Sequence, residues 1–244
     1  MPRFLMVVLL LAGFSSLSFS DTKPTNKYDL LSDTQPAVRR DAVSALGDEQ
    51  KEENISYVIR MLKDVDLEVQ KAAINAIIKF KKSNVVKPLI DAFNSSKEND
   101  VKMAVIMALG DLKNEAAVPF LKGLLKSSYP QYRNGALRAL GKIDKADTYL
   151  DIANMLTDKA EGVRVTAAKI VGHRRIQAGV PLLIKNLSDP VLAVRLACIE
   201  ALGDVGDSSG MASLKALLKD QNKVVVETAK KALEKLNRDT NSIK

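Results

Sequence analysis

A motif that recurs at nearly constant intervals constrains the fold of this chain more than any other feature. If position 0 is the Val of each V-R pair or the residue that replaces it, the anchors are Val38, Val69, Val101, Tyr132, Val163, Val194 and Val225. The numbers of successive anchors differ by 31, 32, 31, 31, 31 and 31. A fixed period of this length is typical of repeat arrays, in which each unit packs on its neighbours. The sequence therefore predicts seven copies of one structural unit.

Each copy carries two sets of apolar residues. The first set lies at positions 0, +4, +7, +8 and usually +11, which is the spacing of one buried helix stripe. The second set lies at +17, +20 and +24. A Gly at +9 in five copies is expected to loosen the C-terminal end of the first helix. We therefore expect two short antiparallel helices per copy, stacked so that neighbouring copies bury each other's stripes.

The recurring phrase L-x-D-x-x-x-x-V-R-x-x-A-x-x-A-L-G resembles the HEAT-like repeat, in the variant named after the phycobilisome lyases. In two copies it is followed by A-V-P-F-L (117–121) or G-V-P-L-L (179–183). The resemblance covers essentially the whole chain after residue 20. It implies an all-α fold, an α-solenoid (armadillo/HEAT-like superhelix) of about seven 31-residue two-helix repeats. It also implies that the V-R helices line the concave side and the Pro-containing helices the convex side.

An Asp at −5 and an Arg at +1 recur together, which resembles the family's ladder of turn aspartates and helix arginines. The pairs are Asp33 with Arg39, Asp158 with Arg164, and Asp189 with Arg195. We expect each Asp to cap its own helix and to pair with the guanidinium of its own copy. Lys102 and Arg133 have Ser96 and Ser127 at −5 instead. These two cations lack a local acid, so they are secondary basic candidates for a partner contact.

The first twenty residues have the pattern of an export signal. Arg3 precedes an apolar run over residues 4–14, and Ser18 and Ser20 occupy the −3 and −1 positions of a cleavage site. Eleven apolar residues are fewer than the roughly 20 that span a bilayer. We therefore predict a signal peptide at 1–20 and the repeat array at 21–244, exported to the periplasm or the extracellular space, without stable membrane insertion after cleavage. An uncleaved anchor is the alternative.

The two outermost copies each replace a regular position by a charged residue. Position +3 is small in copies two to seven but is Asp41 in copy one, and position +5 is apolar in copies one to six but is Lys230 in copy seven. Charged residues in these columns are typical of terminal repeats on which nothing stacks. We therefore expect a monomer that does not polymerise end to end.

The inventory of reactive residues predicts that the chain is not an enzyme. It has one His and one Cys, and it lacks HExxH, CxxC and a glycine-rich phosphate loop. We therefore expect no catalytic residues, no metal site and no cofactor. Cys198 stands at +4, where other copies carry Ala or Val, so we interpret it as a buried structural thiol. His173 is interpreted as a solvated residue rather than a catalytic one.

The V-R helices carry the residues that point to function. If +4 and +7 face the core, then +2 and +6 form the exposed face. This face holds the predicted partner-binding residues Met103, Met107, Arg138, Val165, Lys169, Leu196 and Glu200. Apolar side chains in such numbers are unusual on an exposed stripe, although a tightly curved solenoid would cover them internally. Arg174 replaces the usual apolar residue at +11, and with His173 and Arg175 it completes the secondary basic candidates.

We therefore expect an exported, non-enzymatic scaffold that binds a protein or peptide along its concave face, with Arg138 and Lys169 selecting an acidic neighbour. One alternative is a helper resembling the phycobilin lyases. Another is a binder of nucleic acid or another anionic polymer. The net charge of +8 permits a binder of anionic polymers. The exposed face of the V-R helices, however, carries Glu200 and Glu227 among its cations, which argues against this alternative.

Overall fold

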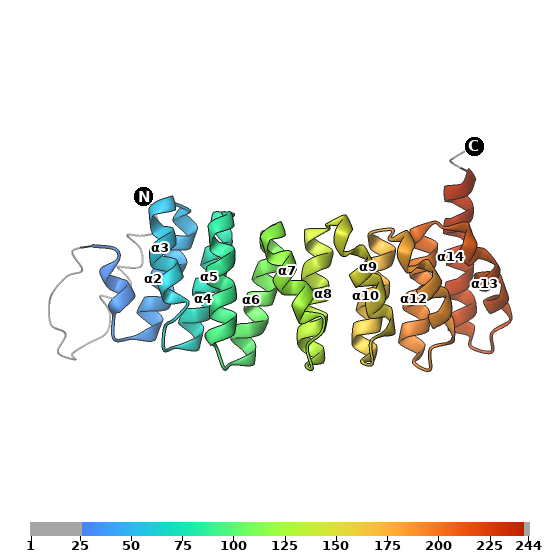
Figure 1. The fold of residues 1–244 in the computed structure, drawn as a ribbon, viewed down its shortest axis with the longest axis horizontal. Helices are drawn as coiled ribbons and strands as arrows, with labels where there is room; N and C mark the ends of the chain where they lie inside the picture. Colours follow the sequence, from blue (N-terminus) through green and yellow to red (C-terminus); the bar gives the residue numbers. More distant parts are fainter. Residues whose placement is uncertain (1–25, 242–244) are drawn as a thin grey trace, which may run out of the picture. The chain divides into compact units, whose positions relative to one another are not determined.

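The computed structural model describes residues 26–241 (Figure 1), so the predicted signal peptide lies outside the described residues. This part of the chain consists of helices and turns, without strands. The described residues form two compact units that divide between Ala104 and Val105, within helix α6.

The first unit stacks pairs of helices. Its elements are η2 (Asp29–Ser32), α2 (Pro36–Glu49), η3 (Glu52–Asn54), α3 (Ile55–Met61), α4 (Leu67–Ile77), η4 (Ile78–Phe80), η5 (Ser83–Val85), α5 (Val86–Ser95) and the start of α6 (Asn99–Leu112). The V-R helices α2 and α4 pack directly on each other, and the short helix α3 packs on both.

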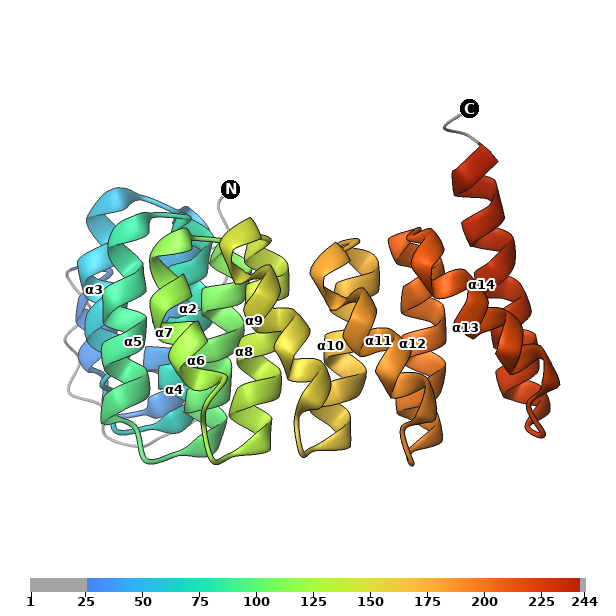
Figure 2. The same ribbon diagram turned by 45° about the vertical axis from the view of Figure 1, so that its right-hand side comes forward.

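The second unit repeats the same arrangement. Its elements are the rest of α6, η6 (Glu115–Ala117), α7 (Val118–Leu124), α8 (Pro130–Ile143), η7 (Ala146–Thr148), α9 (Tyr149–Asn154), η8 (Met155–Thr157), α10 (Glu161–His173), η9 (Gln177–Gly179), α11 (Val180–Lys185), η10 (Asn186–Ser188), α12 (Leu192–Val205), η11 (Ser208–Gly210), α13 (Met211–Ala216), η12 (Leu217–Lys219) and α14 (Lys223–Asn241). The V-R helices α8, α10, α12 and α14 stand side by side, and the short helices form a second layer (Figure 2). The predicted all-α solenoid of two-helix repeats is confirmed.

Every V-R helix from copy one to copy six ends in the same way. The residue at +12 adopts a left-handed conformation with φ between 50° and 79°, and only the last of these six is a glycine: Gln50, Lys81, Lys113, Asp144, Arg175 and Gly206. A single left-handed residue stops a helix and turns the chain. One turn of 3₁₀ helix follows it and leads into the short second helix.

The core lies between the layers, at the predicted positions. Positions 0 and +4 are buried in every copy except Val38, which is half-buried, and +8 is buried throughout. Cys198 is 0% exposed, as expected for a structural thiol. Burial raises the pKa of this thiol to about 12, so the reactive thiolate is not formed at neutral pH.

The glycines at +9 have a different role from the predicted one. The V-R helices continue past them to +11 in α2, α8 and α12, so these glycines do not loosen the helix end. Instead, a Cβ atom added at Gly47, Gly172 or Gly203 would lie 2.5–3.0 Å from the Cβ of the Ala at +7 in the next copy. The absence of a side chain at +9 therefore lets successive V-R helices touch.

The start of the array is fixed by an aromatic contact. The Tyr28 ring stacks on Tyr57 with centroids 3.8 Å apart, and its hydroxyl lies 3.0 Å from Oδ1 of the fully buried Asn54. Asp41 and Lys230, the charged residues of the outer copies, are both exposed. Their placement agrees with the terminal-repeat interpretation, while the monomeric state stays a prediction.

No helix among residues 26–241 is long and apolar enough to cross a membrane.

Candidate functional site

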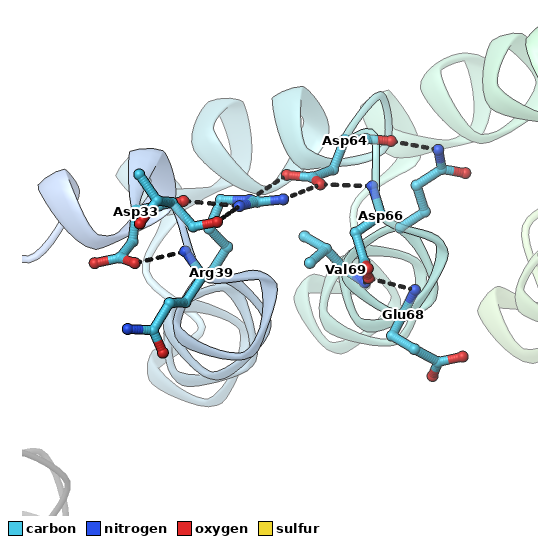
Figure 3. A network of polar contacts seen from close by, with 9 residues as sticks. Asp33, Arg39, Asp64, Asp66, Glu68 and Val69 are labelled. Carbon is cyan, nitrogen blue, oxygen red and sulfur yellow. Dashed lines mark hydrogen bonds and ion pairs between the residues drawn. The ribbon is translucent and has the colours of Figure 1, made fainter. Parts of the chain in front are cut away.

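The recurring Asp and Arg of the repeat pair between neighbouring copies and not within one copy, so the predicted pairing within each copy is wrong. Arg39 donates through Nε and Nη2 to the Asp64 carboxylate of the next copy, at 2.8 and 2.7 Å (Figure 3). Within its own copy, its Nη1 donates to the main-chain oxygen of Asp33 at 2.7 Å. The guanidinium therefore ties one inter-helix turn to the next.

The same rung recurs twice in the second unit. Arg133 makes bidentate contacts with Asp158 at 2.6 and 2.7 Å, and Arg164 makes them with Asp189 at 2.8 and 3.0 Å. Arg133 is 4% exposed, so it is not available to a partner and its prediction as a basic candidate is wrong. Its acidic partner, Asp158, belongs to the following copy, so the residues of a single copy do not reveal the pair.

The aspartates shape turns rather than capping helices. Oδ1 of Asp158 accepts a hydrogen bond from the Ala160 N–H, and Oδ1 of Asp189 accepts one from the Val191 N–H. Bonds from a side-chain oxygen to the N–H two residues on define an Asx turn. The N-cap residues of α10 and α12 make no side-chain cap bond, so the predicted capping role is wrong.

The ladder has a gap in the first unit. Gln70 stands where four other copies carry Arg, and its Nε2 donates only to the main-chain oxygen of Asp64, at 2.5 Å. Ser96 stands at the matching Asp position. A hollow of about 380 Å³ is lined by Leu62, Lys63, Gln70, Ala92, Ser95 and Ser96. Shorter side chains at both ends of the rung account for this space.

The paired carboxylates should make the fold sensitive to acid. Arg39 holds the pKa of Asp64 below its usual range. Burial opposes ionisation of Asp158 and Asp189, but Arg133 and Arg164, together with the turn N–H groups, outweigh burial and lower both pKa values. Because the folded pKa lies below the unfolded one, the stabilisation is present above about pH 4 and is lost as pH falls through the folded pKa.

We therefore expect the free energy of unfolding to decrease as the pH is lowered below about 4. Urea denaturation followed by circular dichroism at a series of pH values measures it. Replacing Arg164 by Gln should flatten this dependence, because Asp189 then titrates closer to its ordinary value. A variant with the same acid dependence as the wild type would contradict the assignment of the lowered pKa to the Arg164 contact.

A second ladder joins the C-terminal ends of the V-R helices. At position +10, Lys79 pairs with Asp48 at 2.6 Å, Lys142 pairs with Asp111, and Lys235 pairs with Asp204 at 2.7 Å. His173 is the +10 residue of copy five and is exposed. It interrupts an alternation of Asp and Lys along this column of the repeat.

Arg174 is bound within the fold rather than offered to a partner. Its Nε and Nη2 donate to the main-chain oxygen of Gly141 at 3.0 and 2.7 Å, and its Nη1 pairs with Asp144. Ile176, two residues later, is 2% exposed and belongs to the apolar core. The contact interpretation of Arg174 is therefore wrong. Arg175 is the left-handed residue of its copy and is exposed.

The predicted partner-binding residues of the second unit lie on one face. Met107 is 57% exposed, and Arg138, Lys169 and Glu200 are exposed as well. Val165 and Leu196 are half-buried. We call these six residues, together with the half-buried Asn134, the stripe. The stripe occupies the +2 and +6 positions of α8, α10 and α12, and Met107 holds the +6 position of α6.

Two candidates lie outside the stripe. Met103 and Lys102 belong to the first unit, and both are half-buried. Lys102 places its ammonium 5.3 Å from the centroid of the Phe93 ring, a cation–π contact within that unit. Neither residue is therefore grouped with the stripe.

One polar atom of the stripe was not anticipated. Among the described residues, the Oδ1 atom of Asn134 is the one side-chain N or O atom that is buried without a hydrogen-bond partner. An unpaired buried acceptor costs about 1–3 kcal/mol. Val165 and Leu196 occupy the equivalent position in the next two copies, so an apolar residue fits there and the repeat does not require an amide.

The family model for HEAT repeats matches residues 28–109, 86–161 and 149–234. These ranges overlap and together cover most of the chain. The chain belongs to the HEAT repeat family. Its V-R helices are the longer helices of the HEAT repeats, and the Asp–Arg ladder and the stripe are features of a HEAT array.

The protein YibA of Escherichia coli K12 is 29% identical in an alignment of 153 positions that covers 61% of this chain and 52% of YibA. The chain therefore spans about half the length of this curated relative. The crystal structure of YibA is 26% identical, with a TM-score of 0.59 over 87% of this chain and 80% of that one.

Two further solved structures with this fold are enzymes by name. The CpcE–CpcF complex of phycocyanin lyase from Nostoc is 21% identical, with a TM-score of 0.51 over 92% of this chain and 98% of that one. Human deoxyhypusine hydroxylase is 22% identical, with a TM-score of 0.46 over 87% and 83%. At these identities the likeness concerns the fold alone.

The expectation that the chain is not an enzyme is overturned by these findings. The phycocyanin lyase complex shares this fold, so the architecture does not separate enzymes from binding proteins. Within residues 26–241, no group of three His, Cys, Asp or Glu side chains gathers in a way that could hold a metal ion.

Proposed function

We propose that this protein is an exported HEAT repeat scaffold that binds a protein or peptide partner on the stripe. The proposal of export is based on the sequence of residues 1–20, which lie outside the described part of the chain. The proposal of binding is supported by one observation. The stripe combines an exposed Met107 and the half-buried Val165 and Leu196 with the exposed charges of Arg138, Lys169 and Glu200.

This combination suits recognition of a polypeptide. Apolar side chains on a solvent-facing stripe stabilise a complex when a partner covers them. Charged residues at the edge of such a surface contribute specificity and association rate. Within the described residues, Arg138, Lys169 and Glu200 form no ion pair, so their charges are available to a partner.

A selection from a phage-displayed library of random peptides on the full chain tests the proposal. We expect the selection to yield peptides that bind the wild-type chain and do not bind a variant in which Met107 and Leu196 are both changed to Asp. Leu150, which is 62% exposed on α9 in the other layer, supplies the matched control, and Leu150→Asp should leave binding intact. Circular dichroism must show that the double variant stays folded. Unfolding would mean that these side chains belong to the core, and it would contradict the proposal, as would binders insensitive to both changes.

A further inference from the structure

Three V-R helices of the second unit place their exposed side chains in register. A Cβ atom added at Gly172 would lie 2.8 Å from the Ala201 Cα. Position +9 of α10 therefore packs against position +7 of α12. A Cβ atom added at Gly141, at +9 of α8, would lie 3.1 Å from the side-chain atoms Cδ1 and Cγ2 of Ile170, at +7 of α10. The offset is therefore constant between neighbouring helices. It follows that Arg138, Lys169 and Glu200, which share position +6, form one straight row.

The row has a fixed charge order: positive on α8, positive on α10 and negative on α12. Neighbouring packed helices lie about 8–10 Å apart, so the three charges are separated by steps of about that length. A complementary ligand must present negative, negative and positive groups at the same spacing.

An extended peptide meets this spacing better than a helical one. In a polyproline II conformation the chain rises about 3.1 Å per residue with three residues per turn, so residues i, i+3 and i+6 share one face at steps of about 9 Å. The apolar part of the stripe over these helices consists of the half-buried Val165 and Leu196, which is too little to cover the apolar face of an amphipathic helix.

The unpaired Asn134 oxygen also favours an extended ligand. This atom lies in the +2 row, one helical turn from Arg138, and lacks a hydrogen-bond donor. A helix uses its backbone N–H groups internally, whereas a polyproline II segment leaves them unpaired. Rotation of the Asn134 amide toward the surface would let such a backbone N–H donate to it.

Resting on the proposed function, we infer that the stripe selects an extended peptide with acidic residues at i and i+3 and a basic residue at i+6. The acidic residues face Arg138 and Lys169, and the basic residue faces Glu200. Because a polyproline II segment can lie in either direction, the reversed order base–acid–acid is equivalent. The order that places the base in the middle is excluded, although it has the same composition and net charge.

Two synthetic peptides test this inference: one with Glu, Glu and Lys at i, i+3 and i+6, and one with Glu, Lys and Glu there. In both peptides Val-Pro separates successive charged residues, and both termini are blocked. Their binding to the full chain is measured by NMR titration at low ionic strength. Exposed ion pairs contribute about 0.2–1 kcal/mol each, so we expect the first peptide to bind about three- to tenfold more tightly, with the preference decreasing at high salt.

A charge-conserving variant provides the decisive comparison. Exchanging Lys169 and Glu200, as Lys169→Glu with Glu200→Lys, changes the row to positive, negative, positive and keeps the net charge. The preference should then reverse in favour of the Glu-Lys-Glu peptide. Equal binding of both peptides, or a preference that survives the exchange, would overturn the inference.

The outcomes also separate this inference from the proposed function. The selected peptides could depend on Met107 and Leu196 but show no acid–acid–base order, while the two synthetic peptides bind equally or not at all. That result would overturn the charge order and leave the proposed binding function intact. Failure to select any peptide that depends on Met107 and Leu196 would instead overturn the proposed function itself.

Discussion

An alanine at Gly172 is expected to lower the free energy of unfolding by about 2–3 kcal/mol, the upper part of the range for overpacking in a tightly packed core. The added Cβ would lie 2.8 Å from the Ala201 Cα and 3.0 Å from its Cβ. Both contacts involve atoms close to the backbone, so no side-chain rotation relieves them. Helix α10 must move away from α12, which weakens the largest helix–helix contact of the unit. Equilibrium denaturation in urea measures the change.

Gly162→Ala is the matched control because it lies on the same helix. An added Cβ there would meet nothing within 4 Å, and Gly162 is exposed. Ala is better than Gly in a helix by up to about 1 kcal/mol, so this variant should be neutral or slightly more stable. Equal effects at the two positions would show that the close approach of α10 and α12 does not account for the glycine.

Replacing Arg164 by Gln is expected to cost about 3 kcal/mol, the lower end of the range for removing one partner of a buried ion pair. The Asp189 side chain is 7% exposed and would lose its guanidinium partner. Glutamine is the appropriate replacement, since Gln70 occupies the same position in copy two and keeps the bond to its turn carbonyl. The change therefore removes the bond to the next copy and retains the one within the copy.

Arg195→Gln is the control for this prediction. Arg195 donates to the main-chain oxygens of Asp189 and Pro190, and within the described residues it forms no ion pair with a carboxylate. We expect a loss below about 1 kcal/mol, the typical net worth of a hydrogen bond. A double-mutant cycle with Asp189→Asn should show strong coupling to Arg164 and little to Arg195. Additive effects at Arg164 would contradict the ladder between copies.

The burial pattern was predictable because it depends on periodicity alone. Val163, Ala167 and Val171 fall on one face of a helix at any register of the array, and all three are buried. The thiol of Cys198 could be interpreted from its column, since neighbouring copies carry Ala there. The stripe could be named in the same way, although its binding role stays a prediction.

Pairing between copies was not predictable from a single copy. The sequence does not say whether an Arg at +1 binds the Asp at −5 of its own copy or the Asp at −5 of the next copy. Arg133 has a Ser at −5 in its own copy, so from the sequence it has no acidic partner. Arg174 likewise looked like a free cation, because its acceptor is a main-chain oxygen of the preceding copy. Both contacts depend on how far one copy is displaced on the next.

The sequence by itself determined the repeat, its two helices and the residues that each helix buries, because a helical period fixes which side chains share a face. The tertiary structure decided which carboxylate each arginine binds, why glycine stands at +9 and which exposed charges line up across α8, α10 and α12. These properties depend on the offset between stacked copies, which is set by the contact of Gly172 with Ala201 and its equivalents rather than by any pattern within one repeat.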